Sequence, residues 1–341
     1  MIDRRSFIKS GAISGIGIVT APSLFGSLNA PAGRRVGIIG LDTSHSIAFT
    51  KTLNAPNAGD KYSNYKVVAA YPKGSLDIKS SVDRIEGYIG QVKEMGVEIT
   101  NSIDELINKV DVVLLETNDG RRHLEQALPV LKAGKRMFID KPMAASLADS
   151  LAIFKASEKY GVPIFSASSL RYIHGIDQLR TGDKGKVLGA ETYSPASLEE
   201  THPDLFWYGI HGVETLFTIM GTGCKTVTRA HTPGADLVVG VWGDNRIGTF
   251  RGIREGKTGY GGKVYTEKDI MVLGQYAGYN PLLEEIVKFF DTGVVPFDPR
   301  ETVEIMAFME AADLSKAKGG KPVSMDKILS KAEKTAGKKA I

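Results

Sequence analysis

The alternation of short apolar runs with amphipathic segments is the feature that most constrains this chain. Runs rich in branched or aromatic residues occupy positions 35–40, 66–71, 110–116, 136–139 and 162–165. Helical patterns lie between the later runs, at 103–108, 123–133 and 148–160. Strands that alternate with helices favour βαβ units around a parallel sheet. We therefore predict an α/β fold whose residues 33–168 form a Rossmann-like, doubly wound domain.

The rest of the chain indicates a second domain. The whole chain has 341 residues, which are enough for about two domains. After position 168, strand-like runs at 186–193, 237–242 and 246–250 are bounded by Gly, Pro and Asp. We predict an α+β domain over residues 169–341. The net charge of +4 is too small and too dispersed to indicate a nucleic-acid partner.

Residues 1–32 have the composition of an export leader, with a charged start, a weakly apolar run and small residues at the end. The pair Arg4-Arg5, followed by Phe7 and Lys9, resembles the twin-arginine export signal. The spacing around Ala30 and Ala32 favours cleavage after Ala32. This resemblance implies a periplasmic protein that crosses the membrane already folded and contacts it only during export.

The loop after the first strand carries an incomplete dinucleotide fingerprint. In G-x-G-x-x-G the second glycine lets the backbone approach a pyrophosphate, and the third allows close packing of the helix. Here Gly40 is present, but Asp42 and His45 stand at the other two glycine positions. Two interpretations remain: a modified dinucleotide loop, or an ordinary turn in which Asp42, Thr43 or Ser44 caps the next helix.

The end of the second strand also departs from the usual pattern. An acidic residue normally binds the ribose hydroxyls there, but this chain continues with Pro72-Lys73-Gly74-Ser75. Lys73 and Ser75 would suit a 2′-phosphate, which favours NADP, although an ordinary turn is the alternative.

Several downstream motifs fall in one order. Thr117-Asn118 ends a strand, His123 opens the next helix, and Asp140-Lys141-Pro142 leaves the following strand. With the segment 209–212 and the closing segment 281–325, they resemble the glucose–fructose oxidoreductase / inositol dehydrogenase / MocA (Gfo/Idh/MocA) family over about residues 34–325. The resemblance implies that the C-terminal sheet is open and mostly antiparallel, and that it supports a homo-oligomer. It also implies NAD or NADP as cofactor, with these candidate contacts: Gly40, Asp42, Thr43, Ser44, His45, Lys73, Ser75, Thr117, Asn118, His123, Asp140 and Lys141.

Two residues are candidates for catalysis. Lys141 follows a strand at the sheet edge where ligands bind, and a desolvated lysine can exchange a proton with a substrate oxygen. His211 lies about 200° around its predicted helix from the apolar stripe that begins at Val213, so it faces solvent or a cleft. The resemblance implies that Lys141 lies between nicotinamide and substrate, and that His211 is the general acid or base. A surface lysine and an exposed histidine are the alternatives.

The substrate contacts are less regular. Trp207 stands where dehydrogenases of the family place an aspartate partner for the histidine, which leaves Asp204 or Tyr208 as possible substitutes. The candidates for substrate contact are Arg171, Tyr172, His202, Asp204, Trp207 and Tyr208, each with a structural role as the alternative. The histidines lack metal-ligand spacing such as H-E-x-x-H and Cys224 is alone, so the sequence predicts no metal site.

These observations lead to two hypotheses. The first is an exported NAD(P)-dependent oxidoreductase that acts on a sugar or polyol-like substrate and retains its cofactor tightly. The second is a carbohydrate-binding protein on the same scaffold that no longer holds a dinucleotide, because fold alone does not fix function.

Overall fold

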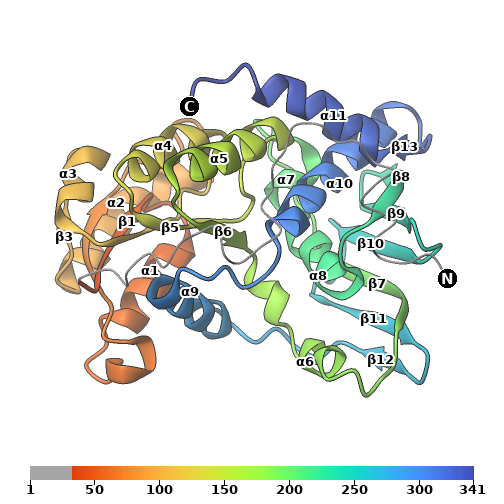
Figure 1. Cartoon of the computed structure of the whole chain (residues 1–341), viewed down its shortest axis with the longest axis horizontal. Coiled ribbons are helices and arrows are strands. Elements are labelled where there is room, and N and C mark those ends of the chain that lie inside the picture. Colours follow the sequence, from red (N-terminus) through yellow and green to blue (C-terminus); the bar gives the residue numbers. More distant parts are fainter. Residues whose placement is uncertain (1–32) are drawn as a thin grey trace.

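The computed structural model describes residues 33–341, so the predicted export leader lies outside the described residues. Two sheets stand side by side, each with its own helices (Figure 1). Within residues 33–341, no helix is both long enough and apolar enough to span a membrane.

The first sheet is parallel throughout and has the order β3-β2-β1-β4-β5-β6. Its strands are β1 (Arg35–Ile39), β2 (Lys66–Tyr71), β3 (Glu98–Ile99), β4 (Val112–Leu115), β5 (Arg136–Asp140) and β6 (Ile164–Ala167). The order reverses between β1 and β4, and in such sheets ligands bind outside the carboxyl ends of the strands at this point. The predicted Rossmann-like sheet is confirmed.

Helices cover both faces of this sheet. One apolar core lies beneath α3 (Ile103–Lys109), α4 (His123–Lys132) and α5 (Leu147–Tyr160). The other lies beneath α1 (Ser44–Leu53), α2 (Lys79–Glu94) and α9 (Asn280–Thr292). The connections include the short helical turns η2 (Gly59–Tyr62), η3 (Gly120–Arg122) and η4 (Ser169–Tyr172).

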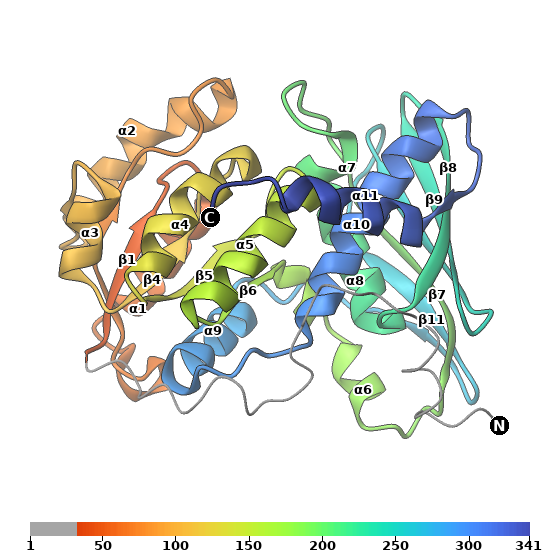
Figure 2. The same ribbon diagram turned by 45° about the horizontal axis from the view of Figure 1, so that its top comes forward.

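Helix α9 departs from the predicted division of the chain at residue 168. Leu282, Ile286 and Phe290 on its apolar face join the core that contains Val36 and Phe138. The chain therefore returns to the first domain after building the second, because the α1 side of the parallel sheet needs a further apolar cover. Figure 2 shows α9 beneath the first sheet, where it lies beside elements from a much earlier part of the chain.

The second sheet is mixed and mostly antiparallel, with the order β12-β11-β7-β10-β9-β8-β13 and one parallel pair, β7 with β10. Its strands are β7 (Val187–Pro195), β8 (Cys224–Thr232), β9 (Ala235–Trp242), β10 (Ile247–Ile253), β11 (Gly261–Thr266), β12 (Ile270–Val272) and β13 (Val323–Ser324). The helices of this part are α6 (Ile176–Arg180), α7 (Asp204–Trp207), α8 (Ile210–Met220), α10 (Pro299–Ala317) and α11 (Met325–Ala336). Phe217 of α8 and Phe308 of α10 pack against each other in its core, while Leu188 and Ile247 on the opposite face are about half exposed. The open, mostly antiparallel sheet is confirmed.

Candidate active site

A cleft of about 360 Å³ lies between the two domains at the carboxyl ends of the parallel strands. Polar side chains from the first domain face aromatic side chains from the second. Its lining includes Thr43, Ser44, His45, Arg84, Asn118 and Lys141 on one side, and Trp207, Tyr208, His211, Tyr260 and Tyr276 on the other. Flat aromatic rings that carry hydroxyl or ring-nitrogen groups suit a ligand with both C–H faces and hydroxyl groups.

Lys141 and His211 reach this cleft from different domains. Lys141 directly follows β5, His211 lies in the first turn of α8, and each is 6% exposed. Burial, together with the nearby charges of Lys141 and His45, lowers the pKa of His211 well below its usual value. The imidazole is therefore neutral near pH 7 and can donate or accept a proton at a ligand oxygen.

Ser168 is the hydrogen-bond partner of His211, which the sequence analysis left open between Asp204 and Tyr208. Its hydroxyl and Nδ1 of His211 form a hydrogen bond of 2.7 Å, and the amide of Leu170 donates to the same hydroxyl. Asp204, one of the two suggested partners, instead forms ion pairs with Arg229 and Lys316. Asp204 is therefore a structural residue, because its carboxylate is already bound by two cations.

Asp42 joins the loops after β1, β2 and β4. Its carboxylate accepts hydrogen bonds of 2.8 Å from the amide of Ser75 and 2.9 Å from the amide of Asn118. A Cβ added at Gly74 would lie 2.1 Å from this carboxylate, so the loop needs glycine there. Asp42 is fully buried and does not line the cleft, which corrects its expected role as a direct cofactor contact.

Other candidates from these loops also have structural partners. Both ring nitrogens of His123 contact backbone carbonyls, those of Thr117 and Met143, at 2.7 and 3.2 Å. The hydroxyl of Ser75 donates to Asp119 and accepts a hydrogen bond from the amide of Ile78. His123, Thr117 and Ser75 are buried and position the loops, while Lys73 is exposed outside the cleft lining. The hydroxyl of Ser75, one of the two residues predicted to receive a 2′-phosphate, is therefore engaged within these loops.

The remaining substrate candidates divide into two groups. Trp207 and Tyr208 line the cleft. His202 is buried with its Nε2 3.3 Å from Asp119, and Arg171 is buried in ion pairs with Glu214 and Glu301. Tyr172 is half-buried beside the core of the first domain, outside the cleft lining. The arginine is structural because its charge is satisfied away from the cleft.

The start of α1 tests whether a dinucleotide fits. Gly40 has φ +90°, and a Cβ there would lie 2.5 Å from the backbone nitrogen of Thr117, so this turn retains its need for glycine. Thr43 and Ser44 line the cleft at the N-terminus of α1, whose first turn carries no acidic residue, and Arg84 of α2 lines the same cleft. A helix N-terminus facing an arginine suits a diphosphate. These residues fit the diphosphate part of NAD(P).

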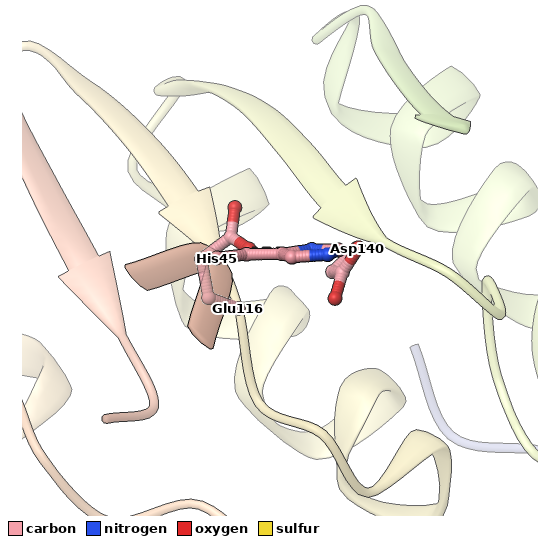
Figure 3. Close-up of side chains that lie close together, drawn as sticks. All are labelled: His45, Glu116 and Asp140. Atoms are coloured by element: carbon pink, nitrogen blue, oxygen red, sulfur yellow. Dashed lines mark ion pairs between the residues drawn. The ribbon is translucent and has the colours of Figure 1, made fainter. Parts of the chain in front are cut away.

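Sequence reasoning named His45 and Asp140 as cofactor contacts, but it missed Glu116 and the meeting of the three residues. His45 in the first turn of α1, Glu116 after β4 and Asp140 at the end of β5 meet in a buried cluster (Figure 3). Nδ1 of His45 lies 3.0 Å from Oδ1 of Asp140 and 3.8 Å from Oε2 of Glu116. Glu116 ends an apolar run in the same side-chain phase as Val112 and Leu114, which is the signal that could have revealed it.

The two carboxylates of this cluster have opposite electrostatic surroundings. Burial, and then the negative charge of Asp140, raise the pKa of Glu116 well above its usual value. Burial also opposes ionisation of Asp140, but the positive charges of His45 and Lys141 outweigh it and lower the pKa of Asp140 to about 2. Without another cation, the cluster therefore keeps a proton on Glu116 while Asp140 is ionised.

Comparison with known proteins agrees with this architecture. Residues 34–168 match the family model described as Gfo/Idh/MocA, an oxidoreductase family with an NAD-binding Rossmann fold. This match extends over all six strands of the parallel sheet. Among curated relatives, the chain is 24% identical over 203 residues to inositol 2-dehydrogenase of Salmonella typhimurium, which covers 57% of this chain and 56% of that protein. It is also 24% identical over 153 residues to an oxidoreductase of Streptococcus pneumoniae, covering 40% of this chain and 41% of that one.

The matches to these curated relatives thus span about two fifths to just over half of the relatives' length. Solved structures extend the likeness in fold. Scyllo-inositol dehydrogenase of Lactobacillus casei, solved with NAD(H) and scyllo-inositol, has a TM-score of 0.67 at 14% identity and covers 86% of this chain and 99% of its own. An oxidoreductase of Agrobacterium radiobacter, solved with NAD⁺, L-tartaric acid and magnesium, has a TM-score of 0.66 at 13% identity and covers 86% and 99%.

Proposed function

We propose that this protein is an NAD(P)-dependent oxidoreductase that interconverts a hydroxyl and a carbonyl group on a sugar or polyol. The observation that carries the proposal is the meeting of Lys141 and His211 in one cleft, each 6% exposed and each contributed by a different domain. The family of the Rossmann domain and the inositol dehydrogenases among the relatives support this reaction class.

The diphosphate would bind where helix, hydroxyl and guanidinium groups converge. Thr43 and Ser44 supply hydroxyls and backbone amides at the N-terminus of α1, and Arg84 supplies a positive charge from α2. When bound, NAD(P) supplies the hydride acceptor or donor. Asn118 adds an amide side chain to the same wall of the cleft.

The substrate hydroxyl would be handled by Lys141 and His211. The neutral imidazole accepts the hydroxyl proton as a carbinol is oxidised, while the Lys141 ammonium donates a hydrogen bond to the same oxygen and stabilises its developing negative charge. Ser168 holds Nδ1 of His211, which directs the other ring nitrogen. Trp207 and Tyr208 provide flat surfaces against which the C–H face of a sugar or polyol can pack.

We propose further that the protein is exported by the twin-arginine route and works in the periplasm. Arg4-Arg5 and the composition of residues 1–32 support this localisation. Because free nucleotide is scarce outside the cytoplasm, the cofactor would be carried out with the folded protein and recycled in place. A homo-oligomer formed through the open sheet belongs to the same proposal, supported by the half-exposed Leu188 and Ile247 on that face.

The test is to purify the exported protein without added nucleotide, denature it and identify released dinucleotide by absorbance and mass spectrometry. We expect about one NAD or NADP per chain, whose redox state changes when inositols and sugars are screened. An empty protein whose melting temperature is not raised by millimolar nucleotide would contradict the proposal. It would favour the carbohydrate-binding hypothesis, which Asp42→Gly and His45→Gly would then probe by restoring dinucleotide affinity.

A further inference from the structure

The cluster of His45, Glu116 and Asp140 has more acceptor atoms than donors. Both oxygens of Glu116 and both oxygens of Asp140 are buried without a hydrogen-bond partner in the described structure. Each of the two carboxylate residues is 0% exposed, so water does not satisfy them from outside. Unpartnered carboxylate oxygens at this depth are costly unless a proton or a cation joins them.

The imidazole does not satisfy these oxygens by itself. Nδ1 of His45 lies at an ion-pair distance of 3.0 Å from Oδ1 of Asp140, but the two atoms form no hydrogen bond. Two ligand atoms of one metal ion also lie close together without a hydrogen bond between them. The third side chain, Glu116, brings Oε2 to 3.8 Å from the same nitrogen.

The spacing of the three side chains fits one metal ion. Their ligand atoms all lie within 4.8 Å of one another. An ion about 2.1 Å from each ligand separates any two of them by at most about 4.2 Å, and the two measured separations of 3.0 and 3.8 Å meet this limit.

We propose that His45, Glu116 and Asp140 bind a divalent transition-metal ion beneath the floor of the cleft. One imidazole and two carboxylates are a ligand set that suits Zn²⁺ or Mn²⁺. Two carboxylates and a neutral imidazole carry a charge of −2, which such an ion neutralises. The positive charge of Lys141 nearby opposes the ion, but within the described residues Lys141 forms no ion pair with either carboxylate.

The backbone explains why these residues meet. Leu115 of β4 lies opposite Ile139 of β5, so the next residues, Glu116 and Asp140, are neighbours at the carboxyl edge of the sheet and share one face. His45 follows the β1 loop, and β1 pairs with β4 on its other side. The ring of His45 separates the cluster from the cleft, because His45 lines the cleft whereas Glu116 and Asp140 do not.

The first experiment is calorimetric titration of Zn²⁺, and separately Mn²⁺, into the purified protein after treatment with a chelator. We expect one saturable site per chain, and affinity weakened at least 10-fold in both Glu116→Gln and Asp140→Asn. Glu304→Gln is the control, since this carboxylate is half-buried and accepts hydrogen bonds from the amides of Gly223 and Cys224 in the other domain. It should bind the ion like the wild type.

Failure of both ions to bind the wild type would overturn the proposal, as would unchanged affinity in both variants. A second measurement does not depend on the folding of any variant. Crystals of the wild-type protein soaked in Zn²⁺ should give an anomalous scattering peak between His45, Glu116 and Asp140. A Zn²⁺ peak elsewhere with no peak at this cluster would also overturn it.

Discussion

Two buried clusters of charge in this molecule are built on opposite principles. In the second domain, Arg229 is fully buried and forms ion pairs with Asp204, Asp236 and Asp313 at 2.6–2.9 Å. In the first domain, Glu116 and Asp140 are buried with one imidazole nearby and no guanidinium. The first cluster uses the Nε, Nη1 and Nη2 atoms of its arginine and leaves Oδ2 of Asp313 without a hydrogen bond. In the second cluster all four carboxylate oxygens lack a hydrogen bond, although His45 lies at ion-pair distance.

This difference separates a structural role from a functional one. Charge that is paired with an arginine inside the protein has little left to offer a ligand, and removal of the arginine leaves its partners unpaired. Charge left incomplete beside a cleft can be completed by a proton, a metal ion or a substrate. The location agrees, because only the second of these clusters has a member, His45, in the wall of the cleft.

The largest expected effect comes from breaking the paired cluster. Arg229→Met removes the cation shared by Asp204, Asp236 and Asp313, so the free energy of unfolding should fall by about 3–5 kcal/mol. Urea unfolding measures this loss. Lys184→Met is the control, because Lys184 and Asp269 form a pair that is more than a third exposed, and its loss should be about 0–1 kcal/mol. Equal losses in the two variants would mean that burial of the arginine cluster adds nothing.

The next effect concerns catalysis in the cleft beside the cluster of His45, Glu116 and Asp140. His211→Asn should lower kcat for the proposed oxidation by about 10²–10⁴-fold, because it removes the group that accepts the proton. Steady-state kinetics with the substrate found by screening measures the loss. His202→Asn is the matched control, since His202 is equally buried but faces Asp119 rather than the cleft. A similar loss in both variants would remove His211 from the proposed role.

The third prediction uses the raised pKa of Glu116 in chelator-treated protein. The folded state holds a proton that the unfolded chain, with a glutamate pKa near 4.5, releases. Stability therefore falls as pH rises above that value, until the folded-state pKa is passed. Glu116→Gln has no carboxyl group to ionise at this position. Its free energy of unfolding relative to wild type should therefore grow by up to about 1.4 kcal/mol for each unit by which the pH rises. Urea unfolding from about pH 5 to about pH 8 measures the trend, and a flat or falling difference would contradict it.

The smallest effect tests the positioning role of Ser168. Ser168→Ala removes a neutral hydrogen bond to Nδ1 of His211, worth about 0.5–1.5 kcal/mol. We expect kcat to fall by about 2–10-fold with KM unchanged, and Ser168→Thr to restore part of it. A change in KM alone would show that the hydroxyl affects binding rather than the orientation of the imidazole.

Sequence periodicity predicted most of the first sheet, and its failures have a physical cause. β3 is only two residues, Glu98–Ile99, and has no apolar run to detect. Helix α2 is largely polar, with Ser81 and Val92 as its buried residues, so its pattern was weak. The incomplete fingerprint was also visible in the sequence, but the bridging role of Asp42 depends on amides 33 and 76 residues away.

The candidate site was predictable residue by residue only where a motif or a helical phase marked it. Lys141 and His211 were found in this way, and both line the cleft. Asp204 and Arg171 were not separable from true cleft residues, because their ion-pair partners come from distant segments. Glu116 was passed over because a charged residue at the end of an apolar run looks like any strand terminus.

The sequence by itself determined the alternation of strands and helices, the glycine turn at Gly40 and the similarity of residues 34–168 to the Gfo/Idh/MocA family. These are local properties, set by side-chain period and by the few conformations a backbone can adopt. The tertiary structure alone decided that α9 returns to the first core and that His45, Glu116 and Asp140 converge. Strand register and the packing of distant helices fix such meetings, and neither is written in any one segment of the chain.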